Sequence, residues 1–206
     1  MRTIVQGDAL AWLASNEAAP HTSVVTSLPD VSELSAFDLP AWKQWFVATA
    51  ALVMRWTPEV AIFYQSDIRF RGALVDKGYL VLRAAEEVGA DVLFHRVVCR
   101  RPAGTVSHGR PSWSHLIAVS RGGWSPARSP GPDVLEGGEM LWSKGMGVGA
   151  CRESCRWLRE NTGTTMVVDP FCGLGTVVAV AESMGFEALG VELGAKRCKQ
   201  ARALQV

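Results

Sequence analysis

The sequence has no long apolar run, no cysteine spacing typical of a disulfide scaffold and no internal repeat. None of its apolar stretches approaches the roughly 18 residues that span a membrane, and the N-terminus lacks the apolar core of a signal peptide. The five cysteines are an odd number, which fits a reducing compartment. These absences argue against a membrane partner and against a secreted, disulfide-stabilised protein, and they predict a cytoplasmic location.

Acidic residues are missing from one segment, 92–132, which carries six arginines. The flanking segments are acidic overall, so the formal net charge is only +1. A basic segment in a near-neutral protein indicates a local anionic partner such as nucleic acid, although a solvated, arginine-rich loop is the alternative. The 206 residues, of which 48% are hydrophobic and 20% charged, suit a single globular domain over 1–206.

Apolar periodicity predicts the elements of an α/β fold. Strands are expected at 2–6, 23–27, 59–64, 92–98, 114–120, 166–169 and 187–192, and helices after residue 8 and at 41–56, 68–77, 150–161, 176–184 and 195–204. Gly78 is the expected cap of the helix at 68–77. Strand–helix alternation predicts a doubly wound, seven-stranded sheet with an antiparallel hairpin in the basic segment at its edge, and 122–138 is expected to be a mobile loop.

A glycine-rich turn lies between a predicted strand and a predicted helix near the C-terminus. The run Val-Val-Asp-Pro-Phe-Cys-Gly-Leu-Gly-Thr ends the strand at Asp169 and turns at Gly173 and Gly175, and Glu192 ends the next strand nineteen residues past Gly173. Glycines let backbone approach a ligand closely, and an acid at the second strand tip accepts hydrogen bonds from ribose hydroxyls. The pattern predicts a nucleoside-binding half-unit, with an ordinary βαβ crossover as the alternative. A nicotinamide dinucleotide fits less well, because Val178 occupies the third glycine position.

The string Asp-Pro-Phe-x-Gly-x-Gly-Thr followed by Gly-x-Glu resembles the S-adenosylmethionine motif of methyltransferases that modify exocyclic amines of nucleobases. The motif order resembles the circularly permuted, beta-class-like group, which includes DNA N4-cytosine and N6-adenine methyltransferases: Gly-Asp-Ala-Leu opens the chain, Ser-Leu-Pro-Asp follows, and the cofactor motif comes last. The resemblance implies a single Rossmann-like methyltransferase domain with S-adenosylmethionine as its cofactor. The implied cofactor-binding residues are Asp8, Asp169, Phe171, Gly173, Gly175, Thr176, Glu192 and Leu193.

The run Thr-Ser-Leu-Pro-Asp, which follows the second predicted strand, resembles the catalytic Asp/Asn/Ser-Pro-Pro-aromatic motif of the same group. Such a turn aligns an exocyclic amine by accepting its two N–H bonds, and the rate comes from positioning and electrostatics. Ser27 and the Leu28 carbonyl are the expected acceptors, and Pro29 matches the second proline. Asp30 replaces the stacking aromatic. We hypothesise that it reads a Watson–Crick edge, with guanine suited best, or helps to take the departing proton; loss of activity is the alternative.

The basic segment and its surroundings are expected to contact the substrate. The candidate substrate-binding residues are Arg100, Arg101, Arg110, Trp113, His115 and Lys144. Trp113 or Trp124 could stack on a base, although packing is the alternative for both. The segment is small for reading a major groove, so structured RNA such as tRNA or rRNA is favoured over DNA. A catalytically silent partner subunit and a small-molecule amine methyltransferase remain alternatives, and a homodimer would supply a second basic surface.

No metal site is expected from the sequence. Cys151 and Cys155 lie four residues apart on a predicted helix and share a face. Two thiols without a further nearby pair are a weak metal signal.

Overall fold

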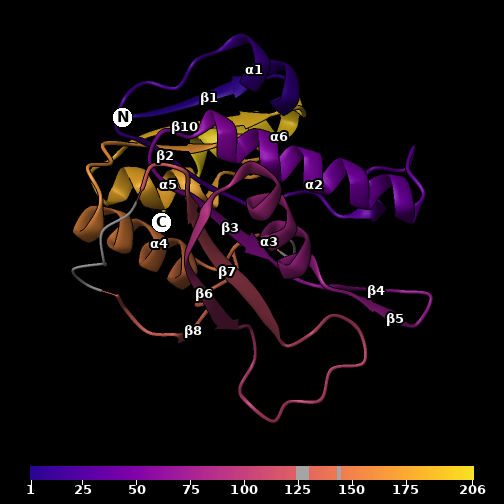
Figure 1. Ribbon diagram of the computed structural model, residues 1–206. Coiled ribbons are helices and arrows are strands. Elements are labelled where there is room, and N and C mark those ends of the chain that lie inside the picture. The colour runs from indigo at the N-terminus through magenta and orange to yellow at the C-terminus, as the bar shows by residue number, and fades with distance from the viewer. Residues whose placement is uncertain (124–129, 143–144) are drawn as a thin grey trace.

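The structure is a computed structural model that describes residues 1–123, 130–142 and 145–206. Within them lies a central sheet in the order β1-β10-β9-β2-β3-β7-β6-β8, with helices on both faces (Figure 1). Its strands are β1 (Arg2–Gln6), β2 (Thr22–Thr26), β3 (Ala61–Gln65), β6 (Asp91–Cys99), β7 (Trp113–Ser120), β8 (Val134–Glu136), β9 (Met166–Asp169) and β10 (Glu187–Glu192). The helices are α1 (Ala9–Ser15), α2 (Leu39–Trp56), α3 (Lys77–Val88), α4 (Val148–Asn161), α5 (Thr176–Ser183) and α6 (Ala195–Ala203), with a short 3-10 turn, η1 (Val31–Glu33).

The sheet is parallel from β1 through β3, and β7 runs antiparallel to both β3 and β6. The predicted doubly wound α/β fold with an antiparallel hairpin is therefore confirmed. The sheet has eight strands rather than the predicted seven. The additional strand, β8, lies inside the segment 122–138 that was expected to be a loop. It pairs in parallel with β6, and three residues are too few to show a strand periodicity in the sequence.

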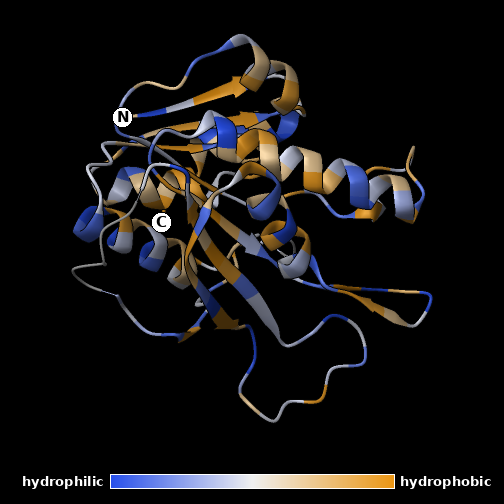
Figure 2. Cartoon of the chain, viewed as in Figure 1, coloured by the Kyte–Doolittle hydropathy of each residue, from blue (hydrophilic) through white to orange (hydrophobic). Residues whose placement is uncertain are grey.

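Each face of the sheet carries its own hydrophobic cluster. Helices α1, α2 and α3 cover one face, where Trp42 and Phe46 are fully buried, and α4, α5 and α6 cover the other, around Trp157 and Leu158. Apolar residues gather at the centre of the sheet (Figure 2), as expected for strands that are buried on both faces. No helix in the described part of the chain is both long enough and apolar enough to cross a membrane.

The prediction of a helix over 68–77 capped by Gly78 is wrong. These residues form a separate hairpin of β4 (Ile68–Phe70) and β5 (Ala73–Val75), and α3 begins directly after it. The hairpin turns at Arg71 and Gly72, both with positive φ, which is the backbone that two-residue hairpin turns require. Asp76 then caps α3 by accepting a hydrogen bond from the Tyr79 N–H at 2.8 Å, so Gly78 lies in the first turn of a helix instead of at the end of one.

Candidate active site

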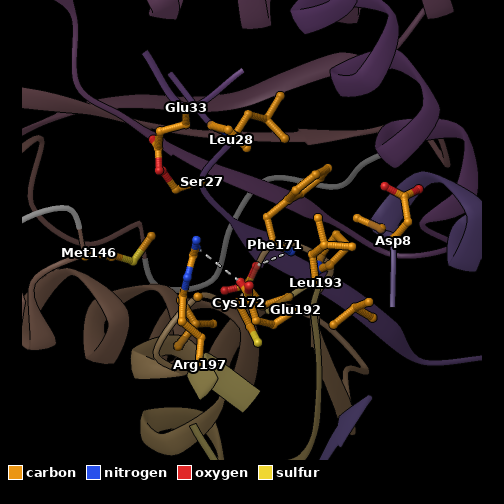
Figure 3. Close-up of a pocket in the computed structure, with 18 of the residues that line it drawn as sticks. Asp8, Ser27, Leu28, Glu33, Met146, Phe171, Cys172, Glu192, Leu193 and Arg197 are labelled. Atoms are coloured by element: carbon orange, nitrogen blue, oxygen red, sulfur yellow. Dashed lines mark hydrogen bonds and ion pairs between the residues drawn. The ribbon is translucent and has the colours of Figure 1, made fainter. Parts of the chain in front are cut away.

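A cavity of about 290 Å³ opens at the carboxyl ends of the central parallel strands. Asp8 follows β1, Ser27 follows β2, Asp169 ends β9 and Glu192 ends β10, and all four line the cavity. Figure 3 shows Ser27 on one side of the cavity and Glu192 on the other. The topological switch point of the sheet lies between β9 and β2: from β9 the chain continues to β10 on one side, and from β2 it continues to β3 on the other. Open α/β sheets bind ligands at such a point.

Most of the predicted cofactor-binding residues meet in this cavity. Its walls include Asp8, Asp169, Phe171, Gly173, Thr176, Glu192 and Leu193. Gly175 does not line it. Its φ is +85°, and a Cβ at this position would lie 2.8 Å from the Ala201 Cβ. Gly175 therefore allows α5 to pack closely against α6, a role in packing rather than in contact with a ligand.

The glycine-rich turn presents backbone and one unsatisfied hydroxyl to the cavity. Gly173 has a φ of +54°, and a Cβ there would lie 2.9 Å from the Trp142 ring. The Thr176 Oγ1 is buried in the first turn of α5 and has no hydrogen-bond partner among the described residues. Buried hydroxyls are normally paired, so a polar group of a ligand would complete this wall.

Glu192 and Asp8 are held by local hydrogen bonds that aim them into the cavity. Glu192 Oε1 accepts a hydrogen bond from the Gly194 N–H at 2.7 Å, and Arg197 Nη1 lies 3.6 Å from its Oε2. Asp8 Oδ1 accepts a hydrogen bond from the Ala11 N–H at 2.9 Å and so caps α1. The N-cap role that the sequence allowed for Asp8 is confirmed, and its position in the cavity wall is compatible with that role.

Asp169 is a buried carboxyl in the wall between β9 and β2. Its Oδ1 accepts hydrogen bonds from the Thr26 hydroxyl at 2.7 Å and from the Phe171 N–H at 3.1 Å. The pKa of Asp169 is raised to about 7, mainly by burial and to a smaller extent by the nearby Glu192 charge, while the two hydrogen bonds oppose the shift. A carboxyl poised near neutrality in a cavity wall is typical of a functional site.

A small polar annex of about 30 Å³ adjoins the cavity beyond Ser27. Its walls are Ser27, Leu28, Asp30, Glu33, Tyr64, Ser66, Lys77, Arg100, Arg110 and Gly145. Ser27 and Leu28 line both spaces, so the two predicted acceptors stand at the junction of the cavity and the polar annex. Pro29 lines the cavity but not the polar annex. Its carbonyl accepts a hydrogen bond from Trp42 Nε1 at 3.2 Å.

Asp30 is the centre of a buried ion-pair network in the polar annex. Its side chain is 7% exposed, and Oδ1 lies 2.6 Å from Lys77 Nζ. Oδ2 pairs with Arg110 Nη2. Burial lowers the pKa of Lys77, and the Asp30 charge opposes that shift. Both carboxylate oxygens are therefore already occupied by cations, and direct reading of a base by Asp30 stays a prediction.

His115 and Trp113 line neither of these spaces, in contrast to their predicted substrate contact. His115 Nε2 lies 3.0 Å from Asp67 Oδ1 and 3.5 Å from Asp76 Oδ1, and its Nδ1 lies 2.8 Å from His95 Nε2. The Trp113 ring packs edge-on against His115, with 4.6 Å between the ring centroids. His115 is buried and ties β7 to the start of α3, because Asp67 also accepts a hydrogen bond from the Lys77 N–H and Asp76 is the N-cap of α3.

Other predicted residues lie elsewhere. Arg101 is exposed in the loop between β6 and β7, and Lys144 and Trp124 lie outside the described residues. Cys151 and Cys155 are buried in α4, where desolvation raises the pKa of both thiols, that of Cys155 to about 12. Ligand atoms of Asp67, Asp76 and His115 lie within 4.8 Å of one another, which is a spacing that could hold a metal ion.

Sequence reasoning missed several residues of the two spaces. They are Trp45, Trp142, Met146 and Arg197 in the cavity and Tyr64, Ser66 and Lys77 in the polar annex. Arg197 carries the one available signal, a basic residue in the first turn of the helix after Glu192. Lys77 was missed because the wrong prediction of a helix over 68–77 placed it at the end of a helix, whereas it is the first residue of α3.

We expect Gly78→Ala to lower the free energy of unfolding by about 1–3 kcal/mol, the cost of overpacking a filled site. A Cβ at Gly78 would lie 2.5 Å from the His115 ring, so the ring would have to leave its bond to Asp67. Urea unfolding measures the change. Gly7→Ala is the control, because a Cβ there meets nothing within 4 Å. Equal stability of the two variants would show that His115 is not held in place by Gly78.

No family model matches the chain, and no curated protein matches it in sequence. Solved structures do match. TTHA0409, a candidate DNA modification methylase from Thermus thermophilus, superimposes with a TM-score of 0.74 at 18% identity, over 98% of this chain and 93% of that one. Its complex with S-adenosyl-L-methionine gives 0.71 at 20% identity, over 98% and 92%. The cytosine-N4-specific PvuII DNA methyltransferase gives 0.73 at 17% identity, over 98% and 85%.

The chain has the fold of these methyltransferases. The resemblance that the sequence motifs indicate is thus confirmed at the level of the fold, and it extends over nearly the whole chain. In this methyltransferase fold, the cavity and the polar annex meet at Ser27, directly after β2.

Proposed function

We propose that this protein is an S-adenosylmethionine-dependent methyltransferase that acts on an exocyclic amine of a nucleobase in nucleic acid. The observation that carries the proposal is the position of Ser27 and Leu28 between two spaces. One space has the walls of a nucleoside site, and the other is small, polar and bordered by arginines. A group-transfer enzyme needs such a junction, where the donor and the acceptor meet.

The cavity fits the proposed cofactor. Glu192 lies at the strand tip where an acid accepts ribose hydroxyls, and Thr176 offers the unsatisfied hydroxyl described above. Its volume of about 290 Å³ is close to the lower end of small-molecule sites. S-adenosylmethionine, when bound, supplies a methyl group on a sulfonium, and the sequence motif places it here.

The residues at the junction would orient the target amine. The Ser27 hydroxyl and the Leu28 carbonyl would accept its two N–H bonds, which would align the nitrogen lone pair with the cavity; the position of both residues in the walls of the two spaces supports this role. The nitrogen would gain the methyl group as the bond between that methyl and the sulfonium sulfur breaks, which leaves a neutral thioether, and the nitrogen would lose one proton. The carboxylates of Asp30 and Glu33 line the polar annex and are the candidates to receive that proton.

Nucleic acid is the proposed partner because two arginines line the polar annex and a third lies next to one of them in the chain. Arg100 and Arg110 line it and Arg101 is exposed next to them, all on the loop between β6 and β7 that projects from the sheet (Figure 1). We infer RNA rather than DNA from the small size of this basic segment. The solved neighbours are named as DNA-modifying proteins, so the test includes both.

The test uses purified protein, labelled S-adenosylmethionine and, in parallel, tRNA, rRNA and unmethylated genomic DNA, followed by nucleoside mass spectrometry. An N-methylated base in one of them is the expected result, and it names the base and the polymer together. Cofactor binding without transfer to any substrate would overturn the proposed function in favour of a silent cofactor-binding subunit. Label on free amines alone would favour a small-molecule enzyme.

Ser27→Ala is expected to lower kcat about 10²- to 10³-fold, the usual effect of removing one oriented hydrogen-bonding group from an active site. Cofactor affinity should change less than about twofold, because the polar contacts proposed for the cofactor involve Glu192 and Thr176 rather than Ser27. Ser66→Ala is the matched control. It removes a hydroxyl that lines the polar annex but not the cavity. An equal loss of kcat in both variants would contradict the role of Ser27.

A further inference from the structure

The polar annex is too small for a nucleobase in this structure. Its volume of about 30 Å³ is room for about one or two water molecules. A base with its exocyclic amine at Ser27 would have to occupy this space. One of its walls must therefore move before methyl transfer, if the proposed function holds.

Arg110 is the wall best placed to move. Lys77 and Tyr64 belong to α3 and β3, and both are buried. Arg110 instead comes from the loop between β6 and β7, and its side chain is 36% exposed. It is held in the wall of the polar annex by its ion pair with the Asp30 carboxylate.

The departure of Arg110 would leave no buried charge unpaired. Lys77 Nζ remains 2.6 Å from Asp30 Oδ1 and continues to balance it, while the Arg110 guanidinium reaches solvent. A second arginine in the wall of the polar annex has an unsatisfied donor. Arg100 Nη1 is buried and has no hydrogen-bond partner among the described residues. An acceptor atom of an entering base would satisfy it.

A phosphate is the group that competes best with Asp30 for Arg110. Arginine binds carboxylate and phosphate through the same forked, charge-assisted hydrogen bonds. A nucleotide within a polymer brings backbone phosphates close to Arg110 when its base approaches the polar annex, whereas a free nucleoside brings none. The same guanidinium can therefore distinguish the two.

We propose that Arg110 makes the site selective for a nucleotide within a nucleic-acid chain: a backbone phosphate takes Arg110 from Asp30, and the base then enters the polar annex. This inference rests on the proposed function. Arg110 acts as a specificity-determining residue, because its ion pair with Asp30 keeps the polar annex closed to free nucleosides, which have no phosphate to replace Asp30.

Arg110→Ala tests the proposal, with cytidine, adenosine, guanosine and a single-stranded oligonucleotide of each base as substrates. The variant should gain about tenfold in kcat/KM on the free nucleoside, because the closed state no longer reduces apparent affinity. It should lose about tenfold or more on the oligonucleotide, because its phosphate contact is gone. Arg110→Lys should restore part of the wild-type preference. Arg101→Ala removes the same charge from the same loop. It should lower kcat/KM for the oligonucleotide and leave kcat/KM for the nucleoside unchanged.

Nucleoside affinity, measured by calorimetry with S-adenosylhomocysteine present, provides a readout that does not depend on turnover. Tighter nucleoside binding by Arg110→Ala than by the wild type supports the proposal. Unchanged nucleoside binding, or an equal loss on nucleoside and oligonucleotide, would overturn it. Absence of methyl transfer by the wild-type protein would count against the proposed function by itself, so the two failures can be told apart.

Discussion

Replacing Asp30 by alanine is expected to lower the free energy of unfolding by about 3–5 kcal/mol at neutral pH, the usual cost of leaving one partner of a buried ion pair alone. Lys77 is 3% exposed and its Nζ lies 2.6 Å from Asp30. Without the carboxylate, the ammonium group must lose its proton or draw water into the core. Arg110 suffers less, because its side chain is 36% exposed and can be hydrated.

The pH dependence of this loss has a defined sign. Burial already lowers the pKa of Lys77 in the folded protein, and removal of Asp30 lowers it further. The unfolded chain then binds more protons than the folded one, so stability rises with pH. The deficit should therefore shrink as the pH approaches the ordinary lysine value of about 10.4.

Urea unfolding at pH 7 and pH 9.5 measures both effects. Asp30→Leu combined with Lys77→Met is the matched variant, because it removes both charges and keeps an apolar volume. It should recover most of the stability, as buried ion pairs often tolerate apolar replacement. A loss of less than about 1 kcal/mol in Asp30→Ala would mean that Lys77 finds another partner in the folded protein.

Asp169→Asn is expected to stabilise the ligand-free protein by about 2–4 kcal/mol at pH 8, since burial raises the pKa of Asp169 to about 7. The folded protein binds this proton more tightly than the unfolded chain, whose carboxyl titrates near 3.9. Stability of the wild type therefore falls as the pH rises from about 4 to about 7 and is level above that. Asparagine keeps an Oδ1 acceptor for Thr26 and Phe171 and carries no charge.

Thermal unfolding between pH 4 and pH 8 checks this prediction, and the advantage of the variant should vanish near pH 4. Asp38→Asn is the control. Asp38 is the exposed N-cap of α2, where asparagine caps as well as aspartate. We also expect the affinity for the cofactor to fall about tenfold in Asp169→Asn, because a buried carboxyl with a raised pKa in a cavity wall is typical of a functional site. An equally stable variant at pH 8 would contradict the raised pKa.

Asp30, which stands where the motif that this segment resembles has an aromatic residue, has a structural explanation in these ion pairs. An aromatic side chain at this position would leave Lys77 without a counter-charge. The polar annex thus has charged side chains where an aromatic residue at position 30 would offer a stacking surface. One of these charges, Arg110, belongs to the loop between β6 and β7. If the proposed function holds, recognition in this chain relies on charge at the point where its relatives in motif rely on stacking.

Local sequence patterns were sufficient for most of the cofactor cavity. The strand, glycine turn and helix from 166 to 183, and Glu192 at the end of β10, depend on periodicity and on glycine's conformational freedom, which act between near neighbours in the chain. The alternation of strands and helices likewise predicted a parallel sheet, and a parallel sheet gathers its strand ends at one edge. Asp8, Ser27 and Glu192 meet there for that reason.

Local patterns failed where they allow two structures equally and where a contact between distant residues determines the structure. The apolar residues of 68–75 suit a helix or a strand equally, and a turn at positive φ at Arg71 and Gly72 makes them a hairpin. Gly78 resembles a helix end, but its lack of a side chain makes room for the His115 ring. Strand β8 exists because the edge of β6 is available to pair with it.

The sequence by itself determined the α/β fold, the glycine turn and the positions of Ser27 and Glu192, because each depends on residues close together in the chain. Only the tertiary structure decided what Asp30 does. Its partners Lys77 and Arg110 lie 47 and 80 residues away in the sequence. No local periodicity records such pairs, since they form only when α3 and the loop between β6 and β7 fold back beside the end of β2.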